Sequence, residues 1–130
     1  MIGTNDAPAF SPQQYQTNLL RIIQISSENG VIPVLSTLPP RADFNNKILA
    51  YNTVIRQLAS SNDIPLWDFY NAAAPLPNNG FGDDGIHLSL PPGAPASTMD
   101  FTAENLQYGT TMRNLTALQT LKAVLENVMY

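Results

Sequence analysis

The chain's only histidine, His87, follows Asp84 by three residues in the segment Asp83-Asp84-Gly85-Ile86-His87. Gly, Asn and Pro residues surround this segment and are typical of a loop. An Asp-x-x-His loop can place its carboxylate against one imidazole nitrogen and leave the other nitrogen free to act as a base. The spacing therefore predicts an acid–base pair made by Asp84 and His87.

Two further polar segments each follow an apolar stretch. Gly3-Thr4-Asn5-Asp6 comes directly after Met1-Ile2, and Ser36-Thr37 ends the run that begins at Val31. In open parallel sheets, ligands bind outside the carboxyl ends of the strands. We therefore expect both segments to share one site with the loop of Asp84 and His87.

The elements that must position these loops alternate between helix and strand. Ser11-Pro12-Gln13-Gln14 has the residues of a capping box with proline at the first helical position. Apolar residues then recur at helical spacing up to Gly30, which fits a helix stop. The apolar face of the first helix contains Tyr15, Leu19, Ile22 and Ile23. The pattern predicts a strand end at Met1-Ile2, a helix from 12 and a strand over 31–36, followed by a helix over 46–61 with Tyr51 on its apolar face and a strand over 64–68. Such alternation favours βαβ units and a parallel sheet.

Residues 75–101 are rich in Pro, Gly and Asn, and we interpret them as a long functional loop. Thr102 is a suitable cap for a last helix. Helical spacing continues through the apolar residues Leu106, Met112, Leu115, Leu118, Leu121, Leu125 and Val128. Such a stripe commonly faces a core, although a dimer seam has the same pattern.

Composition limits the classes of partner. The 130 residues predict a single domain over 1–130. A net charge of −4 and a pI of about 4.6 argue against nucleic acid, which needs clustered Lys and Arg. The absence of cysteine removes thiolate nucleophiles and cysteine-bound zinc. No apolar run reaches the roughly 18 residues of a membrane span, and we expect no cofactor and no metal.

Gly3-Thr4-Asn5-Asp6 and Asp84-Gly85-Ile86-His87, in this order, resemble the third and fifth conserved blocks of the SGNH (GDSL-type) serine esterase family. The segments between them, over 34–40, 51–59 and 64–68, are similar to the strands and helix that the family has there. The resemblance implies a flavodoxin-like, three-layer α/β/α fold with a parallel sheet. It also implies that His87 is the general base, that Asp84 orients it, and that the amide of Asn5 donates to the oxyanion.

The chain departs from the family at the nucleophile. The family's Gly-Asp-Ser block and its second, glycine-bearing block have no counterpart here, because no serine follows Gly-Asp. We expect both blocks, and the N-terminal strands that carry them, to lie upstream of Met1 in a longer hydrolase. The domain would then be N-terminally truncated, and the nucleophile absent from this chain. The strand ending near Ile2 would also have an open edge, which favours a homo-oligomer.

Other interpretations stand beside this one. A non-catalytic binding or oligomerisation module could keep the same scaffold, and a metal-dependent hydrolase could use Asp84 and His87. The pair could also be ordinary turn residues. Ser36 and Ser89 are the serines nearest the proposed site, and Ser36 is the better stand-in nucleophile. A small neutral ester or an acylated carbohydrate suits the weakly charged site, and a secreted or cell-envelope location is slightly favoured over the cytoplasm.

Overall fold

The computed structural model describes residues 2–127, which form two compact units. The first unit contains residues 1–38 and 43–67, and the second contains residues 39–42 and 68–130. The chain crosses between them three times.

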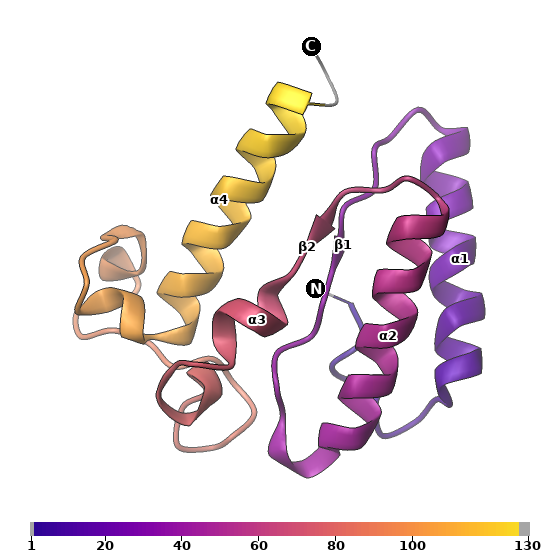
Figure 1. Cartoon of the computed structure of the whole chain (residues 1–130). Helices are drawn as coiled ribbons and strands as arrows, with labels where there is room; N and C mark the ends of the chain where they lie inside the picture. Colours follow the sequence, from indigo (N-terminus) through magenta and orange to yellow (C-terminus); the bar gives the residue numbers. More distant parts are fainter. Residues whose placement is uncertain (1, 128–130) are drawn as a thin grey trace. The chain divides into compact units, whose positions relative to one another are not determined.

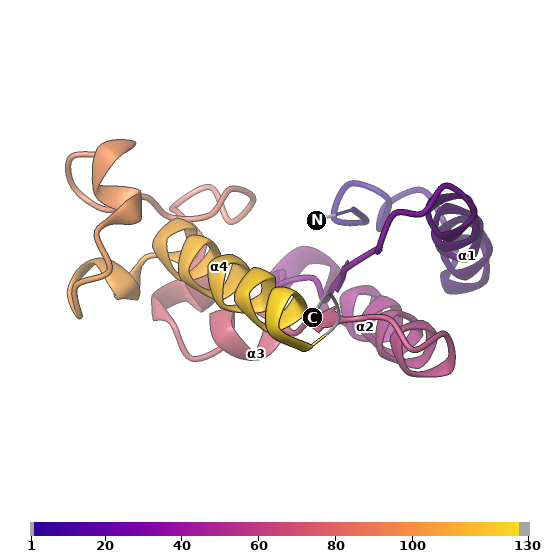
Figure 2. The same ribbon diagram turned by 90° about the horizontal axis from the view of Figure 1, so that it is seen from above.

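The first unit packs two helices on one side of a short parallel sheet. Helix α1 spans Pro12–Glu28 and α2 spans Asn45–Ser61, while strands β1 (Leu35–Ser36) and β2 (Leu66–Trp67) pair in parallel. The two helices lie side by side and on the same side of the strands in both views (Figures 1 and 2). A 3₁₀ helix, η1 (Ala42–Phe44), leads into α2.

Helix α1 begins as its sequence predicts. Ser11 Oγ accepts from the backbone N–H of Gln14, and the side chain of Gln14 accepts from the N–H of Ser11. These two bonds satisfy donors that no carbonyl inside the helix can reach. Of the predicted apolar face, Tyr15, Leu19 and Ile23 are buried, whereas Ile22 is 41% exposed.

The strands are shorter than the predicted ranges 31–36 and 64–68. Leu35 N–H donates to the carbonyl of Pro65 and Thr37 N–H donates to that of Trp67. Pro33 and Pro65 have no N–H to continue the ladder toward the N-terminal ends of the strands. Ile2, expected to end a strand, lies outside any strand, and Met1 lies outside the described residues. The structure thus shows an α/β arrangement with a parallel sheet of two strands.

The second unit is helical and rich in turns. It contains α3 (Phe69–Ala73), α4 (Gly109–Asn127) and the 3₁₀ helices η2 (Pro77–Gly80), η3 (Ala96–Met99) and η4 (Asn105–Gln107). Helix α4, drawn in yellow and orange in Figure 1, contacts α3 and all three of these 3₁₀ helices. Residues 75–101 are therefore partly structured, and not one uninterrupted loop.

The last helix begins six residues later than a cap at Thr102 predicts. Thr102 caps only a turn, in which its hydroxyl accepts from Asn105 N–H. Helix α4 begins at Gly109, where Ser89 accepts from the N–H groups of Gly109 and Thr110. A Cβ at position 109 would overlap the carbonyl oxygen of Gly80, so this position requires glycine. The C-terminal part of the predicted apolar stripe is exposed, with Leu118, Leu121 and Leu125 at 45%, 55% and 38%, and Val128 lies outside the described residues.

Candidate active site

Asp84 and His87 lie in a loop that closes on itself. Gly82 N–H donates to the carbonyl of His87, and Gly85 N–H donates to that of Gly82. An isolated antiparallel bridge joins Phe81 to Leu88 across the base of the loop. Gly85 has φ of +65°, a conformation that a residue with a Cβ rarely adopts. The loop conformation is therefore set by contacts among neighbouring residues.

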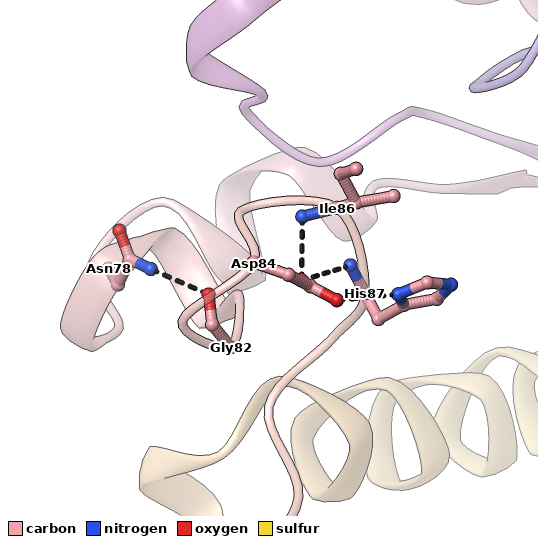
Figure 3. A network of polar contacts seen from close by, with 5 residues as sticks. All are labelled: Asn78, Gly82, Asp84, Ile86 and His87. Atoms are coloured by element: carbon pink, nitrogen blue, oxygen red, sulfur yellow. Dashed lines mark hydrogen bonds and ion pairs between the residues drawn. The ribbon is translucent and has the colours of Figure 1, made fainter.

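Both oxygens of the Asp84 carboxylate are used within this loop. Oδ1 accepts from the backbone N–H groups of Ile86 and His87, each at 2.9 Å. Oδ2 lies 2.7 Å from Nδ1 of His87 (Figure 3). The hydrogen bond from the His87 side chain is the largest cause that lowers the pKa of Asp84, and the two backbone hydrogen bonds lower it further.

These contacts decide which nitrogen of His87 is available. With its pKa lowered, Asp84 is an ionised carboxylate near neutral pH and can only accept hydrogen bonds. Nδ1 of His87 must therefore donate, which leaves the lone pair of a neutral imidazole on Nε2. The ring is 83% exposed, and Figure 3 shows its second nitrogen directed away from the carboxylate. Nε2 can thus accept a proton from a group outside the loop.

Asn5 lies in the first unit, in a series of turns that connects Ile2 to α1. Its side chain is exposed and finds no hydrogen-bond partner within residues 2–127. The amide is thus free to donate to a bound group. The structure brings Asp84 and His87 together in the second unit, whereas Asn5 belongs to the first unit.

The two candidate serines differ in what they contact. Ser89 Oγ donates to the carbonyl of Gly80 and accepts from the N–H of Gly109 at 2.9 Å. Its hydroxyl therefore links η2 to the start of α4, which is a structural role. Ser36, at the end of β1, donates to the neighbouring carbonyl of Thr37.

Two buried side chains support the polar loops and were not singled out by their sequence spacing. Asn52 of α2 accepts from the N–H of Leu38 at 2.7 Å and donates to its carbonyl at 2.9 Å. Tyr51 donates toward the carbonyls of Asp6 and Phe10. The sequence placed Tyr51 on an apolar helix face, and no spacing rule indicates which distant carbonyls such a residue meets.

No cluster of three or more His, Cys, Asp or Glu residues suited to holding a metal ion is found among residues 2–127. Over the same part of the chain, no helix combines the length and apolar character needed to cross a membrane.

The family model of the GDSL-like lipase/acylhydrolase family matches residues 1–90. The chain belongs to this family. The match confirms the resemblance drawn from the sequence motifs, and its range includes both the Gly3–Asp6 segment and the loop of Asp84 and His87. At the level of the family, this match supports a hydrolase that acts on esters. No curated protein and no solved structure matches the chain.

Proposed function

We propose that this GDSL-like chain is the C-terminal part of a carboxylic ester hydrolase that uses a Ser-His-Asp mechanism. The observation that carries the proposal is the 2.7 Å contact between Asp84 Oδ2 and His87 Nδ1, in a chain of this family. We assign His87 as the general base, Asp84 as the residue that orients it, and Asn5 as an oxyanion donor. For the complete protein, we propose a three-layer α/β/α domain.

The nucleophile of the proposal is a serine on a segment N-terminal to Met1, because no serine here follows Gly-Asp. As its Oγ attacks the ester carbonyl carbon, His87 Nε2 takes the hydroxyl proton. The carbonyl oxygen becomes an anion that the amide of Asn5 stabilises. His87 then gives the proton to the leaving alcohol as the carbon–oxygen bond breaks, and water repeats the sequence on the acyl-enzyme.

A neutral acyl ester or an acylated carbohydrate is the proposed substrate. The acidic chain and the carboxylates of Asp83 and Asp84 disfavour an anionic phosphoester by charge repulsion. The exposed His87 also leaves room for a bulky acylated substrate.

The test begins with the coding sequence upstream of Met1, which should contain Gly-Asp-Ser. The longer protein should hydrolyse 4-nitrophenyl acetate. His87→Ala and Asp84→Asn should each lower kcat by about 10³-fold or more, since Asp84→Asn removes the charged acceptor that fixes the tautomer. Asp83→Asn is the matched control, because Asp83 is an exposed carboxylate next to Asp84 and should tolerate the change. An upstream region without such a serine, or an equal loss in the control, would refute the proposal.

The 130-residue chain offers a complementary test. After circular dichroism shows that it is folded, a fluorophosphonate should give no adduct by intact mass. A single adduct that disappears in His87→Ala would show that a serine within the chain is activated. Peptide mapping would then decide whether Ser36 is the nucleophile.

A second candidate function, a strand-binding or oligomerisation module, is favoured by the outer edge of β1. Because Leu35 and Thr37 direct their N–H groups to β2, strand alternation turns those of Val34 and Ser36 to the other edge. No charged residue protects residues 31–38. Beside this edge lies an apolar pocket of about 290 Å³, lined in part by Ile2, Leu19 and Trp67.

We propose a second copy of the chain as the occupant of this edge. The chain should then elute as a dimer in size-exclusion chromatography with light scattering. Val34→Lys should make it monomeric, because a charged side chain on an edge opposes strand pairing. Val34 is 44% exposed, so the substitution should leave the fold intact. A wild-type monomer at high concentration would eliminate this candidate.

A further inference from the structure

The segment that carries Asn5 is a compact series of turns. The carbonyl of Gly3 accepts from the N–H groups of Asp6 and Ala7, and the carbonyl of Asp6 accepts from those of Ala9 and Phe10. These bonds shape the segment internally. They do not fix it to the rest of the first unit, so its orientation depends on other contacts.

Two tyrosine hydroxyls supply contacts of this kind. Tyr51 Oη lies 2.9 Å from the carbonyl oxygen of Phe10 and 3.2 Å from that of Asp6, while Tyr15 Oη lies 3.0 Å from that of Ile2. Carbonyl oxygens only accept, so both phenols donate. Tyr15 comes from α1 and Tyr51 from α2. The turns that carry Asn5 are therefore held on both sides, each by a different helix.

The two phenols are themselves rigidly placed. Their rings stack with centroids 4.0 Å apart and planes within 4°. Tyr51 is fully buried and Tyr15 is 3% exposed. Side chains enclosed in this way have few alternative rotamers, so their hydroxyls keep nearly fixed positions.

Gly3 shows how closely the segment sits on this pair. A Cβ at Gly3 would lie 2.8 Å from Tyr15 Oη and 2.9 Å from the ring, closer than such atoms approach in proteins. Gly3 also has φ of +123°, in a region that other residues rarely adopt. The backbone just before Asn5 thus rests directly on the Tyr15 ring.

Burial and the charge of Asp6 keep the hydroxyls of Tyr15 and Tyr51 protonated, so that both can donate. Burial raises the pKa of Tyr15 and of Tyr51, and the Asp6 carboxylate raises both further. An ionised phenol could not donate to a carbonyl. Both contacts therefore persist across the range in which the proposed esterase would work.

We propose that Tyr51, supported by Tyr15, is a positioning residue that sets the direction of the Asn5 amide. The inference rests on the proposed role of Asn5 as an oxyanion donor. Such a donor contributes only when it is aimed at the developing charge, and small displacements reduce its effect strongly. Tyr51 would thus affect catalysis without touching the substrate.

Tyr51→Phe tests the inference, because it removes one hydroxyl and keeps the stacked ring. In the 130-residue chain, the side-chain amide signals of Asn5 should shift in ¹H–¹⁵N spectra. Backbone amide exchange at Ala9 and Phe10 should accelerate by about fivefold, as expected for the loss of one hydrogen bond. Tyr108→Phe, in the second unit, is the matched control and should change neither. Unchanged Asn5 signals in folded Tyr51→Phe would overturn the inference, whatever the activity.

A double-mutant cycle in the longer, active protein separates positioning from general support. Tyr51→Phe should lower kcat by about tenfold with KM unchanged, and should have no further effect once Asn5 is alanine. Additive effects would mean that Tyr51 acts elsewhere. If Asn5→Ala leaves kcat intact, the proposed role of Asn5 itself fails. If Asn5→Ala lowers kcat and Tyr51→Phe does not, only the positioning role fails. Should Tyr51→Phe not fold, Tyr15→Phe removes the bond to Ile2 and takes its place in both tests.

Discussion

The Asp84 carboxylate joins the backbone of its loop to the imidazole of His87. One oxygen receives two backbone N–H groups and the other receives the ring. This arrangement explains why the Asp-x-x-His spacing was enough to predict the contact between Asp84 and His87 from the sequence. All the partners of Asp84 lie within three residues of it, so no long-range packing is needed to bring them together.

Asp84 should titrate well below the ordinary aspartate pKa of about 3.9. Because the folded pKa is lowered, the loop contacts stabilise the folded state above that ordinary value. They are lost as the pH falls through the lowered pKa. Carbon-13 NMR of the carboxyl group measures the midpoint. In His87→Ala the midpoint should rise toward the ordinary value, since the imidazole hydrogen bond is the largest cause. A midpoint near 3.9 in the unmodified protein would contradict the geometry.

Residues with distant partners could not be identified in the same way. Tyr51 was predicted only as part of an apolar face, yet its hydroxyl meets carbonyls 41 and 45 residues away in the chain. Periodicity indicates which residues are buried but not what their polar atoms contact.

At the scale of elements, helix boundaries with local signals were predicted well. Helix α1 begins at Pro12, and α2 begins at Asn45, one residue before its predicted start. The start of α4 was missed, because the close approach of Gly109 to Gly80 is a tertiary contact. The strands were overestimated for a related reason. Apolar residues predict a buried segment, but pairing also needs N–H groups that Pro33 and Pro65 lack.

Asn52 joins α2 to Leu38 in the segment that follows β1, and its removal should destabilise the fold. Asn52→Ala would leave the N–H and the carbonyl of buried Leu38 without partners, so we expect a loss of about 3 kcal/mol in the free energy of unfolding. Urea denaturation measures the loss. Thr53→Ala, at the next position of α2, removes only an exposed bond to Leu49 and should stay within about 0.5 kcal/mol of wild type. Equal losses would show that Asn52 has no special role.

At the scale of the molecule, the sequence predicts one domain, and the structure divides into two compact units. The single domain stays a prediction. It implies one cooperative unfolding transition. Asn52→Ala weakens the first unit, and Gly109→Ala should weaken the second because its Cβ would overlap Gly80.

If the domain is single, both substitutions should lower the urea midpoint of Trp67 fluorescence. Trp67 is the only tryptophan and lies in the first unit. Circular dichroism should give the same midpoints. If Gly109→Ala leaves the urea midpoint of Trp67 fluorescence unchanged, the two units unfold separately.

The loop from Phe81 to Leu88 bears on how new specificities could arise within the GDSL-like family. Its bridge, its turn and the contact between Asp84 and His87 are all internal to eight residues. Outside these eight residues, the Asn78 amide also donates to the carbonyls of Phe81 and Gly82, so the segment that holds its own shape extends over residues 78–88. Insertions after Leu90 could add surface beside the proposed site without altering the contact between Asp84 and His87. New specificities could therefore arise next to an unchanged pair of proposed catalytic residues, and a grafted copy of residues 78–88 is a natural starting point for engineering.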